Sequence, residues 1–142
     1  METDSNSKGA MVELQCMSSF IKNGFIVSTP HGGHARYDFV ADKGGKMLRV
    51  QCKAYTLSED GTSFSFQTRV NTTTSRGYKS HSYTEEDVDL LATVVGGTCY
   101  VVPISECGGS SKTLRLRDSR RKAYKNSNYA GNYVIEKQLQ DS

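Results

Sequence analysis

Three polar residues in the middle of this chain have the types and the spacing to act together on a bound cation. Asp38 and Gln51 carry oxygen ligands, and Lys53 follows Gln51 after one apolar residue. Between them lies Gly44-Gly45, and two glycines can both take the positive φ angles of a type I′ turn. A hairpin closed by this turn pairs residues whose numbers sum to 89. Asp38 then faces Gln51.

The predicted hairpin has one apolar side and one polar side, because side chains alternate along a strand. Tyr37 and Phe39 belong to the apolar side, whereas Asp38, Gln51 and Lys53 share the other. Facing residues have Cβ atoms ~5 Å apart, so both oxygens can reach one hard cation with ligands at about 2.1 Å. The lysine ammonium can hold a phosphate oxygen or orient a water molecule beside that cation.

The pattern D-x12-Q-x-K resembles the core hairpin of the PD-(D/E)XK nuclease superfamily. In that hairpin an Asp precedes an acid or Gln, one apolar residue and a Lys. Within the superfamily the chain is most similar to small homing endonucleases of bacterial group I introns, and next to archaeal-type Holliday junction resolvases. The resemblance runs from about Lys8 to Ile104. In two departures, Tyr37 stands in place of Pro, and Gln51 replaces the usual acid and removes one negative charge. The alternative interpretation is an ordinary exposed hairpin.

The resemblance also implies a helix before the sheet that carries a further acid. Ser5 to Ser7 offer N-caps, and Gly24 marks the end of such a helix. Its apolar stripe recurs at helical spacing. The stripe consists of Ala10, Leu14, Met17 and Ile21. Glu13 lies at the edge of this stripe and matches the family's additional acid by position, although a surface glutamate is the alternative.

By this resemblance the catalytic residues are Glu13, Asp38, Gln51 and Lys53. The expected cofactor is Mg²⁺, with Mn²⁺ as the alternative. Its ligands would be Glu13, Asp38, Gln51 and the main-chain carbonyl of Cys52. Asp87 and Asp89 offer two more carboxylates, but acids stabilise the start of a helical turn, and that explains them better than a second metal.

The remaining pattern predicts an α/β (α+β) domain with a restriction-endonuclease-like core. A short strand is expected at residues 25–29 and a fourth strand at 64–70, with Gln67 and Arg69 on one face. Residues 71–83 have almost no apolar side chains and are expected to form a surface loop. The apolar runs at residues 90–95 and 98–104 flank Gly96-Gly97 and predict a second hairpin. The result is a mixed sheet of five or six strands with flanking helices.

Basic residues gather in the C-terminal segment at about 108–133 and are interleaved with tyrosines, a composition that fits nucleic acid. A solvated charged face is the alternative. The expected DNA-binding residues are His34, Arg36, Gln67, Arg69, Arg76, Lys79, Arg115, Arg117, Arg120, Arg121, Lys122 and Lys125.

The whole chain of 142 residues has the length of a single domain, spanning 1–142. It contains no apolar run near 18 residues, and its polar N-terminus lacks a secretory signal, so a cytoplasmic protein without a membrane span is expected. A phage or mobile-element origin is plausible by analogy. The four cysteines lack C-x-x-C spacing, which favours reduced thiols over a zinc site shared with His31, His34 or His81.

Three functions fit these expectations. The first is a site-selective, homing-type DNA endonuclease, cutting both strands or nicking one. The second is a Holliday junction resolvase with the same site, which recognises DNA shape. The third is a nuclease relic that binds DNA without cutting it. Cutting two strands requires two sites, so a homodimer or higher homo-oligomer is expected.

Overall fold

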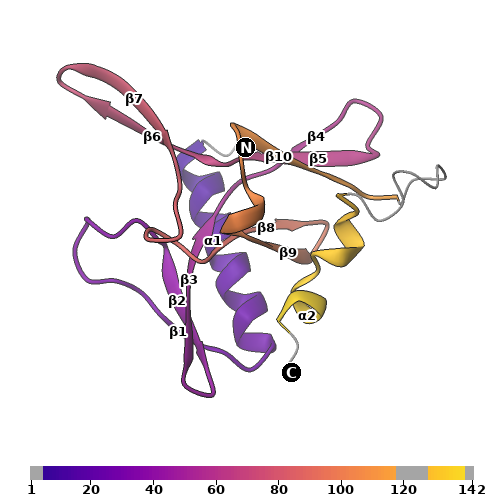
Figure 1. Ribbon diagram of the computed structural model, residues 1–142. Helices are drawn as coiled ribbons and strands as arrows, with labels where there is room; N and C mark the ends of the chain where they lie inside the picture. The colour runs from indigo at the N-terminus through magenta and orange to yellow at the C-terminus, as the bar shows by residue number, and fades with distance from the viewer. Residues whose placement is uncertain (1–4, 118–127, 140–142) are drawn as a thin grey trace.

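The chain forms two packed β-sheets, one long helix and a projecting hairpin (Figure 1). The structure, a computed structural model, describes residues 5–117 and 128–139. Its elements are α1 (Ser5–Lys22), β1 (Ile26–Ser28), β2 (Phe39–Lys43), β3 (Lys46–Cys52), β4 (Thr56–Leu57), β5 (Ser63–Gln67), β6 (Arg69–Thr74), β7 (Gly77–Ser82), β8 (Leu90–Val95), β9 (Thr98–Pro103), β10 (Ser111–Arg115) and α2 (Ile135–Gln138), with 3-10 turns at Ile104–Glu106 and Ala130–Asn132.

The central sheet has the strand order β1-β2-β3-β8-β9. Its pairs are antiparallel except β3 and β8, which run parallel, so the sheet is mixed and five-stranded as predicted. Gly96 and Gly97 close the β8–β9 hairpin with φ angles of 57° and 82°. The parallel pair of β3 and β8 joins the β2–β3 hairpin to the buried β8–β9 hairpin. The hairpin that carries the predicted site residues is therefore attached to the core of the protein.

Helix α1 covers one face of the central sheet. Cys16 and Phe20 are fully buried, and the Phe20 ring makes edge contacts with Phe39 at 5.3 Å between centroids. The predicted stripe was wrong in part, because Leu14 and Ile21 are 64% and 58% exposed. Two faces of this helix carry apolar residues, and the pattern alone does not say which one meets the sheet.

The opposite face of the central sheet packs against a small sheet with the order β10-β5-β4. Phe64, Phe66 and Leu114 of this sheet form a second core cluster with Leu91. The expected single strand at 64–70 is therefore divided. It breaks at the buried Thr68, whose hydroxyl donates to the Gly109 carbonyl at 2.9 Å.

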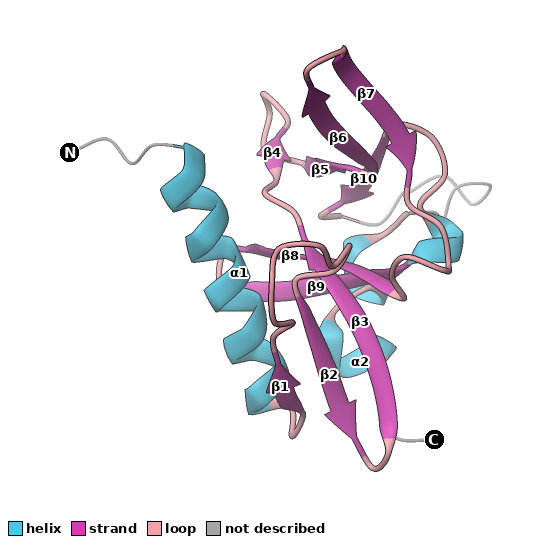
Figure 2. Cartoon of the chain, turned by 90° about the vertical axis from the view of Figure 1, so that its left-hand side faces the viewer, coloured by secondary structure: helices cyan, strands magenta, loops and turns pink. Residues whose placement is uncertain are grey.

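Strands β6 and β7 form a two-stranded ribbon that extends from the body of the protein, as Figure 1 and Figure 2 both show. The expectation of a loop at residues 71–83 was wrong. Residues 79–82 of β7 are exposed, and a strand that faces solvent needs no apolar alternation, so the usual strand signal is missing. The ribbon begins at Arg69, whose guanidinium binds Ser80 and Ser82 of the opposite strand at distances of 2.8 to 3.2 Å.

Asp87 and Asp89 are bound to arginines of the predicted hairpin region. Asp87 accepts from Arg36 at 2.9 Å and from the Thr84 amide at 3.0 Å. Asp89 accepts from the amide and the side chain of Arg49 at distances of 2.8 to 3.2 Å. Residues 85–87 form a turn and not the start of a helix. The two acids therefore fix the approach to β8, in agreement with a structural role. No helix of the described residues is long and apolar enough to cross a membrane.

Replacing Asp89 by Asn should reduce stability in a pH-dependent way. Burial acts to raise the pKa of Asp89, but the hydrogen bonds from Arg49 hold it below its ordinary value. The stabilisation is therefore complete above the unfolded pKa and is lost as the pH falls through the folded pKa. At pH 7 Asp89→Asn should lower the free energy of unfolding by about 1 kcal/mol, since the pair is a third exposed and screened.

Urea unfolding at a series of pH values measures this difference. The exposed Glu85→Gln in the same turn is the control for loss of a carboxylate charge, and it should have little effect. A penalty for Asp89→Asn that is equal at neutral and strongly acid pH would contradict the argument.

Candidate active site

The β2–β3 hairpin has the register that the sequence predicts. Phe39 pairs with Val50 and Lys43 with Lys46, so the numbers of every pair sum to 89. Gly44 and Gly45 have φ angles of 61° and 83°, which a two-residue type I′ turn requires. The paired register ends at Phe39, so the predicted pairing of Asp38 with Gln51 lies beyond the ladder and stays a prediction. Asp38 lies at the end of β3, where it contacts Cys52 and senses the charge of Lys53.

Asp38 is held at two points by β3. Its amide donates to the Val50 carbonyl at 2.8 Å, and its carboxylate accepts from the Cys52 amide at 2.8 Å. Tyr37 departs from the predicted apolar side: it packs against the second core cluster, whereas Phe39 lies in the first. The reason is that β2 begins only at Phe39, and the chain bends before it.

Helix α1 brings Glu13 close to Asp38. Both carboxylates are half-buried. Burial, followed by the negative charge of Asp38, raises the pKa of Glu13. Burial also raises the pKa of Asp38, although the Cys52 amide and the charge of Lys53 act in the opposite direction. Two acids whose neutral forms are favoured together form a place where a cation would be stabilising.

Lys53 directly follows β3, and its amide donates to the Ala92 carbonyl of β8 at 2.8 Å. Burial lowers the pKa of its ammonium, and the negative charge of Asp38 opposes this effect. The ammonium lies 3.4 Å from the Arg69 carbonyl and 4.8 Å from the centroid of the Tyr83 ring. Burial, followed by the charges of Asp38 and Asp87, raises the pKa of Tyr83 to about 12, so its phenol is neutral.

Sequence reasoning assigned no part in the site to Tyr83. No local pattern could have found it, because Tyr83 reaches Lys53 only through the fold of the β6–β7 ribbon between them.

The donor set is one that a divalent cation accepts. Carboxylate, amide and carbonyl oxygens are the ligands that Mg²⁺ takes in proteins. Glu13 and Asp38 offer two carboxylates, and Gln51, the predicted third ligand, is half-buried on β3 and carries a neutral amide. Within residues 5–117 and 128–139, no group of three or more His, Cys, Asp or Glu side chains is arranged to hold a metal ion. A cation here would therefore depend on neutral oxygens in addition to the two acids.

The cysteines are free thiols in this structure. Cys16, Cys52 and Cys99 belong to the core cluster beneath α1, whereas Cys107 lies in the second cluster. Burial raises the pKa of Cys107 to about 12. These thiols pack as small apolar side chains.

The predicted DNA contacts differ in their exposure to solvent. Arg36 is 60% exposed but pairs with Asp87, and Arg69 is fixed on β7. Arg115 is half-buried. The exposed residues are His34, Gln67, Arg76, Lys79 and Arg117. The other four predicted contacts, Arg120, Arg121, Lys122 and Lys125, lie outside the described residues.

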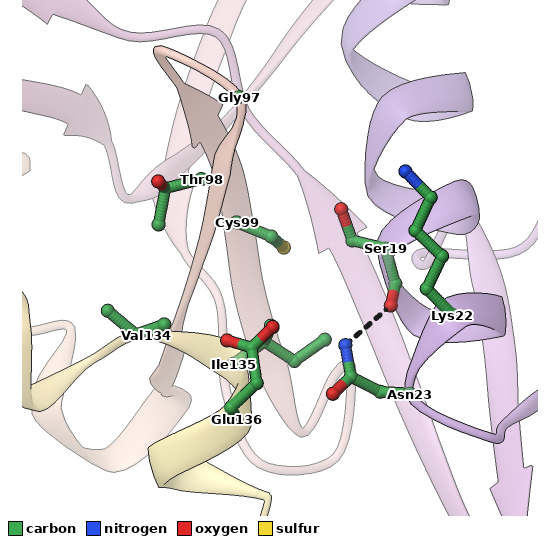
Figure 3. Close-up of a pocket in the computed structure, with 9 residues that line it drawn as sticks. All are labelled: Ser19, Lys22, Asn23, Gly97, Thr98, Cys99, Val134, Ile135 and Glu136. Atoms are coloured by element: carbon green, nitrogen blue, oxygen red, sulfur yellow. Dashed lines mark hydrogen bonds between the residues drawn. The ribbon is translucent and has the colours of Figure 1, made fainter.

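A pocket of about 470 Å³ adjoins the lysine. Its lining includes Lys53, Tyr55, Gln67 and Ser111, so it lies between the end of β3 and the small sheet. A second pocket, of about 280 Å³, lies between the end of α1, the β8–β9 turn and α2 (Figure 3). Its wall includes Asn23, which donates to the Ser19 carbonyl at 2.8 Å. It contains none of the predicted site residues.

A five-stranded mixed sheet with a long helix on one face, and with Asp38 at the end of its central hairpin, is consistent with a restriction-endonuclease-like fold. The sequence profile of the PD-(D/E)XK endonucleases matches residues 3–136. The chain therefore belongs to the PD-(D/E)XK endonuclease family and is a nuclease.

Comparison with solved structures agrees with this assignment. The chain is similar to a bacterial homing endonuclease, I-Ssp6803I, with a TM-score of 0.76 and 26% sequence identity over 96% of this chain and 93% of the other. A comparison with curated proteins found no match.

Asp38→Asn should lower the pKa of Glu13 toward its ordinary value in the metal-free protein. The substitution removes the negative charge that disfavours ionisation of Glu13, while the hydrogen bond from the Cys52 amide can be kept by the amide oxygen. A carboxyl-carbon NMR titration measures this pKa. Asp42→Asn, on the same hairpin, is the control and should leave it unchanged. An unchanged value in Asp38→Asn would mean that the two carboxylates are not neighbours.

Proposed function

We propose that the chain is a Mg²⁺-dependent DNA endonuclease of the site-selective, homing type. One observation supports this proposal: Asp38 lies within electrostatic reach of both Glu13 and the Lys53 ammonium, and the pKa of both carboxylates is raised. A solvated surface hairpin would not collect these three groups in a half-buried position. The same observation argues against a relic that has lost its site.

The metal ligands would be Glu13 and Asp38, joined by the Gln51 amide oxygen and the main-chain carbonyl of Cys52. When bound, a divalent ion polarises the phosphate and makes a coordinated water molecule more acidic. Mn²⁺ would suit the same oxygen donors. The Cys52 amide holds the Asp38 carboxylate in place, and a metal ion would bind this oriented carboxylate.

Lys53 would act on the phosphate itself. Its ammonium reaches the site from the end of β3 and is attracted by Asp38. A positive charge fixed in a half-buried position stabilises the negative charge that develops on a phosphate during hydrolysis. It would also orient the attacking water molecule.

DNA would be bound by the exposed basic side chains around this site. Arg76 and Lys79 lie on the ribbon, and His34 lies on the loop before β2. A two-stranded β-ribbon fits into the major groove of DNA. Cleavage of both strands would need a second site, so the active form would be a dimer or a higher oligomer with two-fold symmetry.

Asp38→Asn and Lys53→Met should each reduce the single-turnover rate of DNA cleavage by at least about 100-fold. The reason differs between them, since the first removes a metal ligand and the second removes a charge from the phosphate. Asp42→Asn is the matched control and should cut at the wild-type rate. The measurement compares supercoiled plasmid, linear duplex and a four-way junction, with Mg²⁺, with Mn²⁺ and with a chelator.

Each outcome of this experiment has a defined meaning. Metal-dependent cutting at fixed sequences supports the homing-type function, whereas cutting that follows the branch point supports a junction resolvase. DNA binding without cleavage of a target-bearing library would support the relic and contradict the proposal. Retention of full activity by either variant would contradict the assigned roles.

Gln51→Glu should lower the Mg²⁺ concentration needed for half-maximal cleavage. The substitution adds a negative charge to a site that has two carboxylates, and charge count is one factor that sets the affinity of oxygen sites for cations. A metal titration of the cleavage rate measures the effect. Gln15→Glu, at an exposed position of α1, serves as the control because it adds the same charge outside the proposed ligand set. An unchanged or higher Mg²⁺ requirement would place the Gln51 side chain away from the metal.

A further inference from the structure

The Lys53 ammonium is held by the two ends of the β6–β7 ribbon. It donates to the carbonyl of Arg69, the first residue of β6, at 3.4 Å. It also lies over the ring of Tyr83 at 4.8 Å, and Tyr83 directly follows the last residue of β7. Both ends of the ribbon therefore contact Lys53, the lysine that the family motif makes catalytic.

The base of the ribbon is well fixed. Arg69 pairs with Ser82 in the strand register, and its guanidinium donates to the Ser80 hydroxyl at 2.8 Å and the Ser80 carbonyl at 2.9 Å. Tyr83 is half-buried and packs against the second core cluster. The Tyr83 ring thus has a defined position relative to the core.

A lysine needs such a support to work on a single phosphate oxygen. Its ammonium is carried on a flexible four-carbon stem and has three rotatable donors. Attraction to an aromatic face directs the ammonium without using all of its donors. The Arg69 carbonyl takes one of them, and the others remain for phosphate or water.

We propose that Tyr83 is a positioning residue for Lys53, whose aromatic face holds the ammonium in the orientation needed for cleavage. This inference rests on the nuclease function proposed above and adds a residue to that site. The simpler explanation is that Tyr83 only fills the second core cluster. The two explanations differ in what the ring must do, because packing depends on apolar volume and positioning depends on the π-face.

The test compares Tyr83→Phe with Tyr83→Leu in the full-length chain. Phe keeps the ring and removes the hydroxyl, whereas Leu keeps an apolar side chain and removes the π-face. Positioning predicts that Tyr83→Phe cuts within about twofold of wild type. It predicts that Tyr83→Leu cuts about 10- to 100-fold more slowly in single turnover, since small misplacements of a catalytic group are costly. The dissociation constant for DNA in Ca²⁺ should be unchanged in both.

Two further measurements keep the result interpretable. Thermal unfolding shows whether each variant is folded. Tyr100→Leu, which removes a buried tyrosine ring from the same core cluster, is the control for loss of a ring. The ring current of Tyr83 should shift the ε-methylene protons of Lys53 upfield in wild type and Tyr83→Phe but not in Tyr83→Leu. The Lys53 signal is assigned by its absence in Lys53→Arg.

The outcomes separate this inference from the proposed function. A folded Tyr83→Leu that cuts at the wild-type rate, or a Tyr83→Phe as slow as Tyr83→Leu, overturns the positioning role. An absent ring-current shift overturns it even if no DNA is cut. A wild-type protein that shows the shift but cuts no DNA in any condition overturns the nuclease function, and with it any role for Tyr83 in cleavage.

Discussion

The site depends on one constraint, the attachment of Asp38 to the strand that carries Gln51 and Lys53. The Asp38 amide and carboxylate bind Val50 and Cys52, each at 2.8 Å, so the acid cannot move independently of β3. The strand in turn pairs with the buried β8 in parallel. A catalytic group needs a rigid support because small displacements are costly, and here the support is backbone pairing, which no surface side chain can replace.

The sequence predicted the hairpin well because its determinants are local. Gly44-Gly45 sets the turn, the alternation of side chains sets the faces, and together they fix the register to the residue. The β6–β7 ribbon could not be predicted in the same way. Its sequence lacks the apolar period that reveals a strand, and its polar composition is equally typical of a loop. The Tyr83 contact with Lys53 is a consequence of that ribbon and was equally inaccessible.

The face of α1 shows a different limit of pattern reading. Leu14 and Ile21 lie at helical spacing, and so do Cys16 and Phe20, but only the second pair is buried. Helical spacing shows which residues share a face of the helix, but it does not show which face packs against the sheet. A helix with two apolar faces can therefore pack in two orientations. The prediction that Glu13 lies near the sheet does not depend on this choice, because Glu13 lies between the two apolar faces of the helix. Its nearness to Asp38 then follows from the contact of Phe20 with the hairpin residue Phe39.

The acids near the hairpin divide into two kinds by their surroundings. Burial acts to raise the pKa values of Asp87 and Asp89, but hydrogen bonds hold both below the ordinary range. The Thr84 amide and then Arg36 act on Asp87, and Arg49 acts on Asp89. Glu13 and Asp38 have raised pKa values, for which burial is the main cause. A carboxylate that is already paired with an arginine of the protein gains little from a second cation. Two neighbouring carboxylates whose pKa values are both raised are stabilised most by a cation that binds from solution. This division, rather than the number of acids, separates the structural pair from the pair suited to catalysis.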